Sequence, residues 1–340
     1  MLQSLLDCNS IHNLLRLLAA DKSEFEAHKG TPLMQENLSH LTEDLAERGI
    51  HGAQANHPLS QICTFRIGGE AKIILTPENA EELIYCIKKL RKLGIPYMTV
   101  GSASNLLFDD RGFNGAVIRT NRLKTVTLEN GIMTAEAGVP LPHLSHVAMK
   151  NSMGGLHGLC GIPGTVGGSI ITAAGAFGCN IYDRITETEA YFPNEDRVRT
   201  LPLTATDFSY RKSPEILKDA VILRVSFRLP PEDRQSIEEK ISYCAAQRRS
   251  TQPHGIPSAG SYFKRPENAP PAALLIDQAG LKGLTVGGAS VSEKHAGFII
   301  NSGNATAEDV KTLAEIIKTT VLHRFGVTLT EEVQTVPYQL

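Results

Sequence analysis

Two glycine-rich segments of the chain contain the residues best suited to bind an anionic ligand. The first, Gly101-Ser102-Ala103-Ser104-Asn105-Leu106, directly follows a strand-like stretch. The second runs from Gly158 through Gly161-Ile162-Pro163-Gly164-Thr165 to Gly167-Gly168, and Ala173-Ala174-Gly175 follows shortly after it. Glycine lets backbone N–H groups approach a ligand closely, and consecutive N–H groups in such turns form a concave anion site. Together the two segments suit a pyrophosphate.

Each segment alone has a simpler explanation, because glycines also make tight turns. Neither segment has the G-x-G-x-x-G pattern, and neither is a P-loop, since no Gly-Lys-Ser/Thr follows. A dinucleotide-binding fold of the common nicotinamide type is therefore not indicated.

Three other segments contain side chains that could hold or move charge. Tyr210-Arg211 puts an arginine beside an aromatic residue, and Gly260-Ser261 puts a serine on a glycine turn just before Lys264-Arg265. Glu331-Glu332 lies near the C-terminus. Taken singly, each is more often an exposed surface segment. Their chemistry matters only if the fold brings them to one place.

The periodicity of apolar residues predicts the elements that would position these groups. Residues 1–50 read as small helices, interrupted near Lys29-Gly30-Thr31-Pro32. A helix at 78–93 lies between strands, which is the start of an α/β unit. The expected strands are 64–67, 71–75, 96–100, 116–119, 125–128, 132–137, 185–192, 198–202, 220–228, 298–301 and a strand-like tail at 327–336. Further helices are expected at 141–151, 236–249, 272–278 and 307–325.

Composition narrows the class of protein. The 340 residues carry a formal net charge of −2, with 41% apolar and 21% charged residues, as in ordinary globular domains. Such a charge gives no whole-molecule attraction to nucleic acid or to an acidic membrane. No apolar run approaches the length of a bilayer span, and the start of the chain lacks the basic region of a signal peptide. The prediction is a cytoplasmic protein without nucleic-acid or membrane partners.

The six cysteines are scattered singly. No C-x-x-C pair occurs, and no Cys/His cluster has zinc spacing, so no metal site is predicted. Isolated cysteines in a chain of this size suggest reduced thiols.

A set of motifs in a fixed order resembles one family, the UDP-N-acetylenolpyruvoylglucosamine reductases. The resemblance extends from about residue 56 to the C-terminus and is closest to the shorter, second type of the enzyme. No single motif is specific, but their order and spacing are. They are Thr64-Phe65-Arg66-Ile67-Gly68-Gly69, Ser104-Asn105-Leu106-Leu107, Gly161–Gly168, Tyr210-Arg211-Lys212-Ser213, Gly260–Pro266, Gly280-Leu281-Lys282-Gly283, Ser292–Phe298 and Glu332-Val333.

The resemblance implies a mixed α+β fold with an FAD-binding part of the vanillyl-alcohol-oxidase type. That part would cover residues 56–229, in two subdomains at about 56–122 and 123–229. A C-terminal α+β substrate domain would follow at 234–326, and a strand within 327–340 would return to the FAD part. Residues 1–55 would be a helical extension.

The resemblance also implies the reaction and its residues. FAD and NADPH would serve to reduce UDP-N-acetylenolpyruvoylglucosamine to UDP-N-acetylmuramate for peptidoglycan. Arg211 would hold the substrate carboxylate, a protonated Glu332 would stabilise the developing negative charge, and Ser261 would donate a proton. The glycine segments quoted above would hold FAD. The expected substrate-binding residues are Tyr210, Lys264, Arg265, Lys282 and His295.

Some positions differ from the family pattern. The first glycine segment usually reads Gly-Gly-Gly-Ser-Asn, whereas this chain has Ser102 and Ala103 in it. Ser213-Pro214-Glu215 follows Tyr210-Arg211-Lys212 where the family often has Ser-x-Phe. Gln334 stands where an arginine is common. These differences concern the shape of the FAD loop and one substrate contact.

Two alternatives stay open at the level of sequence. One is an FAD-dependent oxidase of sugars or lactones, although many of those attach flavin through a histidine in the first loop, and none occurs between Pro96 and Val117. The other is a flavin or nucleotide-sugar binder without turnover, which the joint presence of Arg211, Ser261 and Glu332 disfavours.

Overall fold

The first sheet of the computed structural model, which describes residues 32–339, has four strands in the order β1-β2-β5-β3. Strand β1 pairs antiparallel with β2, while β2 and β3 both run parallel to β5. The bounds are β1 Ala53–Pro58, β2 Glu70–Leu75, β3 Tyr97–Val100 and β5 Phe113–Arg119. The parallel pairs require crossovers, and helix α3 (Ala80–Lys92) supplies the one from β2 to β3.

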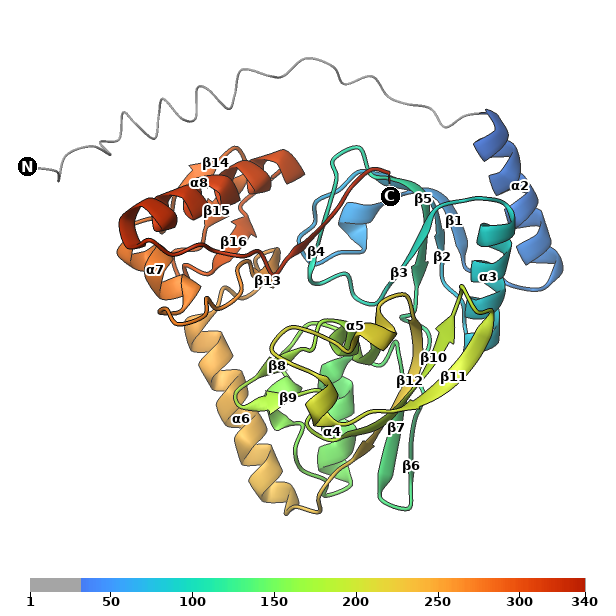
Figure 1. Ribbon diagram of the computed structural model, residues 1–340, viewed down its shortest axis with the longest axis horizontal. Coiled ribbons are helices and arrows are strands. Elements are labelled where there is room, and N and C mark those ends of the chain that lie inside the picture. The colour runs from blue at the N-terminus through green and yellow to red at the C-terminus, as the bar shows by residue number, and fades with distance from the viewer. Residues whose placement is uncertain (1–31, 340) are drawn as a thin grey trace, which may run out of the picture.

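Helix α3 begins two residues later than the predicted range 78–93 and ends before Gly94, as expected. The Asn79 side chain accepts a hydrogen bond from the Glu82 backbone N–H at 2.9 Å, and Gly94 ends the helix with a positive φ of 65°. Helix α2 (Pro32–Glu47) packs beside α3 (Figure 1). Leu41 and Leu45 are buried in the same core as the inner face of α3, so α2 covers that face of the molecule.

The second sheet is antiparallel and five-stranded, in the order β11-β10-β12-β7-β6. Helices α4 (Leu141–Lys150) and α5 (Val166–Ile171) share its core. The bounds are β6 Val126–Glu129, β7 Ile132–Glu136, β10 Ile185–Phe192, β11 Arg197–Pro202 and β12 Val221–Arg228. A short hairpin of β8 (Gly175–Ala176) and β9 (Cys179–Asn180) follows α5.

The third region begins with the long helix α6 (Arg234–Thr251), which leads away from the second sheet (Figure 1). It continues into an antiparallel sheet of order β13-β16-β15-β14, packed against α7 (Ala272–Gln278) and α8 (Ala307–Phe325). The strand bounds are β13 Ser258–Ser261, β14 Thr285–Val286, β15 Ala289–Val291 and β16 Phe298–Asn301. Thr306 and Asp309 form a capping box at the start of α8.

The C-terminal tail returns from the third region to the first glycine segment. Strand β17 (Gln334–Val336) runs parallel to β4 (Leu106–Phe108), and the red tail in Figure 1 crosses back toward the first sheet. Phe108, Tyr262 and Val333 belong to one buried cluster. The first sheet, the third region and the tail therefore share a core.

The structure differs from the sequence-based expectations in two strands and one helix. The strand predicted at Thr64–Ile67 is wrong: Arg66 has a left-handed φ of 57°, and the segment turns so that Thr64 and Phe65 can bond to the third region. The tail forms a strand only at its last part, β17. Helix α5 was missed because two of its six residues are glycines. The helices expected within residues 1–31 lie outside the described residues.

Candidate functional site

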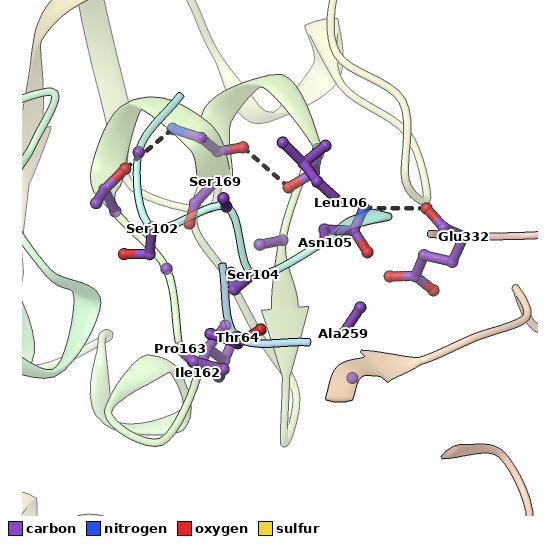
Figure 2. A pocket seen from close by; sticks show the side chains of 18 of the residues that line it. Thr64, Ser102, Ser104, Asn105, Leu106, Ile162, Pro163, Ser169, Ala259 and Glu332 are labelled. Atoms are coloured by element: carbon purple, nitrogen blue, oxygen red, sulfur yellow. Dashed lines mark hydrogen bonds between the residues drawn. The ribbon is translucent and has the colours of Figure 1, made fainter. Parts of the chain in front are cut away.

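A cavity of about 840 Å³ opens where the two glycine segments, the third region and the tail meet. It lies toward the upper end of the size range of small-molecule sites. Its wall includes all the glycine-segment residues that were expected to hold FAD, together with Arg211, Ser261 and Glu332. Figure 2 shows Ser102, Ser169 and Ile162 on one side of the cavity, and Ala259 and Glu332 on the other.

The first glycine segment packs directly against the second. A Cβ atom on Gly101 would lie 2.1 Å from Thr165 Oγ1, which leaves no room for any other residue at this position. Ala103 has a left-handed φ of 47°, where the family usually has glycine. The methyl group of Ala103 is buried, so the differing residue fits the loop at the cost of some backbone strain.

The second glycine segment turns into helix α5 at the cavity wall. Thr165 caps this helix by accepting a hydrogen bond from the Gly168 N–H at 3.5 Å. Gly167 donates its N–H to the Ala137 carbonyl, and a Cβ there would lie 2.8 Å from Ala137 Cβ. The glycines thus let backbone and small hydroxyl groups, instead of bulky side chains, line this wall.

These two segments fit a pyrophosphate-containing cofactor. Gly164 faces the hydroxyls of Ser104 and Ser169, since a Cβ on it would lie 3.6 Å from each Oγ. No carboxylate from either segment lines the wall. An uncharged cradle of N–H and hydroxyl donors is the donor set that a pyrophosphate requires.

Arg211 and Glu332 meet at the opposite wall. Arg211 Nε lies 2.5 Å from Glu332 Oε1, and the two side chains are only 20% and 19% exposed. The guanidinium also donates to the carbonyls of Ala173, at 3.3 Å, and Gly175, at 3.4 Å. We call the wall made by Arg211, Ser261 and Glu332 the reactive wall. Arg211 therefore connects the reactive wall to the end of the second glycine segment.

Burial dominates the electrostatics of Glu332. Desolvation raises the pKa of the Glu332 carboxyl, while the positive charges of Arg211 and Lys264 oppose that rise. Raising a carboxyl pKa by burial is how proteins keep such a group protonated at higher pH. Glu332 is thus poised to gain a proton if its contact with Arg211 weakens.

Backbone pairing brings Ser261 to the same wall. The Glu332 N–H donates to the Tyr262 carbonyl at 2.8 Å, next to Ser261 at the end of β13. Asn105 fixes the same strand from the cofactor side: its Nδ2 donates to the Glu332 carbonyl at 3.0 Å, as drawn in Figure 2. The Gln334 N–H donates to the Asn105 carbonyl at 2.9 Å.

The five residues expected to bind substrate are not among those that line the cavity. The Tyr210 hydroxyl accepts a hydrogen bond from the Arg265 N–H at 3.2 Å, so these two lie together. Lys264 is close enough to lower the pKa of Glu332. Lys282 pairs with Asp277 at 2.7 Å.

His295 is the fifth of these residues, and it lies in a packed site. Its ring packs edge-on to Phe298, its Nδ1 accepts from the Gly297 N–H at 3.1 Å, and burial lowers its pKa. This environment favours a neutral imidazole at the edge of the third region.

Sequence reasoning missed one group of cavity residues. They come from the end of α6 and the loop after it: Ala245, Arg248, Arg249, Gln252, Pro253, His254 and Ile256. The available signal was the basic pair Arg248-Arg249 shortly before Pro253, at the junction leading to Ser261.

No group of three or more His, Cys, Asp or Glu residues within 32–339 could hold a metal ion. None of the helices described there has the length and apolar character needed to cross a membrane.

Comparisons with known proteins agree with the site. Residues 71–201 match the family model of an FAD binding domain, and residues 252–336 match that of the C-terminal domain of UDP-N-acetylenolpyruvoylglucosamine reductase. The reductase of Caldicellulosiruptor bescii is 41% identical over 281 residues, covering 82% of this chain and 89% of that protein. The one of Clostridium perfringens is 38% identical over 277 residues, covering 82% and 90%.

A solved structure also matches. The UDP-N-acetylenolpyruvylglucosamine reductase of Thermus caldophilus superposes with a TM-score of 0.70 at 31% identity, covering 84% of this chain and 98% of that one. The predicted mixed α+β fold, with an FAD-binding part followed by the reductase C-terminal domain, is confirmed. The chain belongs to the UDP-N-acetylenolpyruvoylglucosamine reductase family.

Proposed function

We propose that this protein reduces the enolpyruvyl ether of UDP-N-acetylenolpyruvoylglucosamine to UDP-N-acetylmuramate, with FAD and NADPH, in peptidoglycan precursor synthesis. The observation that carries the proposal is the meeting of Arg211, Ser261 and Glu332 at one wall of a cavity whose other wall is made of glycine segments. We assign residues 56–229 to FAD binding and residues 234–326 to substrate binding. A cytoplasmic location, without nucleic-acid or membrane partners, is part of the same proposal.

The two glycine segments would hold FAD, which would supply the redox chemistry by which a hydride from NADPH reaches the β-carbon of the enolpyruvyl group. The residues of the chain must then deal with negative charge that develops beside the substrate carboxylate. Arg211 is suited to hold that carboxylate, because a guanidinium makes two parallel charge-assisted hydrogen bonds. It is already oriented by the Ala173 and Gly175 carbonyls.

Glu332 can stabilise the developing charge only as a neutral acid, since a second carboxylate would repel it. A substrate carboxylate would compete with Glu332 for Arg211. Weakening that ion pair removes an influence that lowers the pKa of Glu332, and burial then favours the protonated form. Substrate binding would in this way raise the pKa of Glu332 further, and the carboxyl would take up a proton from solvent.

Ser261 is the proposed proton donor to the α-carbon. A free hydroxyl is a weak acid, but a carbanion is a strongly basic acceptor. The exposed Ser261 ends strand β13 at the cavity wall. NADPH and the substrate would use this side of the flavin in turn, which predicts ping-pong kinetics; a requirement for both ligands at once would contradict this.

The test is the visible spectrum of the purified protein, followed by NADPH oxidation with and without UDP-N-acetylenolpyruvoylglucosamine. A yellow protein whose NADPH oxidation rises sharply with this substrate supports the proposal. A yellow protein that ignores the substrate but consumes oxygen with a sugar would make it an oxidase. A protein that cannot be reconstituted with FAD would contradict the flavin chemistry itself.

A further inference from the structure

A second cavity, of about 300 Å³, lies beside α6, and none of its lining residues lines the larger cavity. The residues come from α6, from the turn His157–Leu159 and from the loop of the β8–β9 hairpin. They are His157, Phe177, Glu239, Lys240, Tyr243 and Cys244. The cavity therefore brings a thiol and an imidazole together at a place where the proposed reaction uses neither.

The imidazole of His157 also contacts a second thiol. Cys179 Sγ, on strand β9, lies 3.3 Å from His157 Nε2. Helix α6, which carries Cys244, and strand β9 both pack against the turn His157–Leu159. Burial raises the pKa of the Cys244 thiol, and the neighbouring Cys179 thiol adds to that rise. We call Cys179, Cys244 and His157 the thiol cluster.

The hairpin that carries Cys179 is short and strained. Its strands have two residues each, and the loop residues Phe177 and Gly178 both have a positive φ, of 51° and 74°. Such a two-residue turn favours Asn, Asp or Gly at its first position, so phenylalanine is unfavourable there. A hairpin with so few backbone hydrogen bonds can shift without unfolding the core. A small shift of this kind can bring Cys179 onto Cys244.

We propose that Cys179 and Cys244 form a disulfide when hydrogen peroxide enters the second cavity, with His157 as the base that activates Cys179. His157 takes the proton of Cys179, and the thiolate sulfur attacks one peroxide oxygen. The O–O bond breaks, and the leaving hydroxide takes the proton from the imidazolium to become water. The sulfur of Cys244 then attacks the sulfenic acid on Cys179 and displaces a second water. One peroxide is thus reduced to two waters, and two thiols are oxidised to one disulfide.

The surroundings of the thiol cluster explain why it needs this base. Burial raises the pKa of the Cys179 thiol, so the thiol alone is protonated and unreactive at neutral pH. Burial also lowers the pKa of His157, which leaves a neutral imidazole that can accept a proton. The contact between these two side chains therefore decides whether Cys179 reacts.

The disulfide would act on the wall of the larger cavity. Ala176 begins the hairpin loop and Ala245 follows Cys244, and both alanines line the larger cavity. The Phe177 ring lies 5.2 Å from the guanidinium carbon of Arg248, which lines that cavity too. Drawing the hairpin onto α6 would shift this wall. Resting here on the proposed function, we expect oxidation to weaken FAD binding by on the order of tenfold and a reducing thiol to restore it.

The test treats the full-length protein with a small excess of hydrogen peroxide and maps disulfides by peptide mass spectrometry. We expect a link between Cys179 and Cys244 that dithiothreitol removes and that Cys179→Ala or Cys244→Ala prevents. His157→Gln should slow formation of the link by on the order of tenfold or more. Cys63→Ala and Cys86→Ala are the controls, because these thiols are buried in other cores, and both variants should form the link normally.

Peroxide that leaves both thiols reduced would overturn the proposal, as would a link from either thiol to Cys160, the third thiol near Cys244. An unchanged rate in His157→Gln would exclude His157 as the base. Flavin fluorescence titration of the flavin-depleted protein, before and after oxidation, measures the effect on FAD. Affinities within twofold of each other, with the link formed, would refute that effect. Failure of the reduced, unsubstituted protein to bind FAD would contradict the proposed function, while mass spectrometry would still decide whether the disulfide forms.

Discussion

The two walls of the cavity are built in different ways. The glycine wall, made by the segments at 101–106 and 161–168, offers backbone N–H groups and small hydroxyls. Its glycines are needed because a side chain at these positions would collide with neighbouring atoms. The wall made by Arg211, Ser261 and Glu332 offers charged and protic side chains, and its backbone only positions them. Arg248 lies between these two types, as a charged side chain resting on the glycine wall.

This difference explains where the chain can depart from its family. Ser102 and Ala103 replace glycines that are usual there, and the loop still forms because both residues are small. The glycine wall thus requires small residues, whereas the reactive wall requires residues with particular functional groups. Changes to the reactive wall should alter the rate of turnover, and changes to the glycine wall should alter cofactor binding.

The largest expected effect is that of Ser261→Ala on the reactive wall. Without the hydroxyl, proton delivery to the α-carbon should slow, and kcat should fall by about 10²–10⁴. FAD binding should stay the same, because no backbone group changes. Steady-state NADPH oxidation measures kcat, and flavin titration measures FAD binding. Ser258→Ala in the same strand is the control, since Ser258 bonds to Thr64 through its carbonyl; equal losses in both variants would refute the assignment.

Glu332→Gln should lower kcat by about 100-fold and change the pH dependence of stability. Because burial raises the pKa of Glu332, the native state keeps its proton where the unfolded chain has lost it. Unfolding free energy therefore falls as pH rises from the ordinary glutamate value through the raised one, and this contribution is complete only below that window.

Glutamine does not titrate, so thermal melting of Glu332→Gln should lack this decline. The variant should gain in melting temperature relative to the unsubstituted protein as pH rises through the window. Glu331→Gln serves as the control. It loses a half-buried ion pair with Lys318, in which the two side chains lie 2.9 Å apart, and should show no such gain. A constant difference across the window would show that Glu332 titrates normally.

Gly101→Ala should break the glycine wall. Its methyl group would collide with Thr165 Oγ1, and relief of such overpacking typically costs enough to weaken FAD binding by on the order of tenfold or more. The double variant with Thr165→Ala should recover part of the affinity, because the closest atom is removed. Flavin fluorescence titration measures both. Ser102→Gly restores the usual family residue and should bind FAD at least as well as the unsubstituted protein. Normal FAD binding by Gly101→Ala would show that a methyl group at this position does not disturb the FAD loop.

The smallest expected effect is that of Lys282→Ala. Lys282 pairs with Asp277 outside the cavity wall, so its loss should raise the KM for the UDP-sugar less than about threefold. Lys264→Ala is the informative comparison, because Lys264 lowers the pKa of Glu332. A larger KM effect from Lys282 than from Lys264 would mean that the third region moves on substrate binding.

The sequence predicted the elements with a regular pattern and the order of the motifs. Helix α3, with its Asn79 cap and Gly94 end, and the long helices α6 and α8 follow from local rules. The turn at Thr64–Ile67 does not, because its apolar alternation looks like a strand until the carbonyls of Phe65 and Ser258 find partners across the molecule. Helix α5 was not predicted either, because glycines are poor helix formers and Gly167 is needed for close packing against Ala137.

The sequence by itself determined which chemical groups the site could use: two glycine segments, an arginine, a serine and a glutamate. Only the tertiary structure decided that Arg211 and Glu332, 121 positions apart, would form one ion pair. That pairing depends on β17 running beside β4 and on Glu332 bonding to the strand that carries Ser261. Contacts between distant segments follow from the packing of the whole core, so no local pattern encodes them.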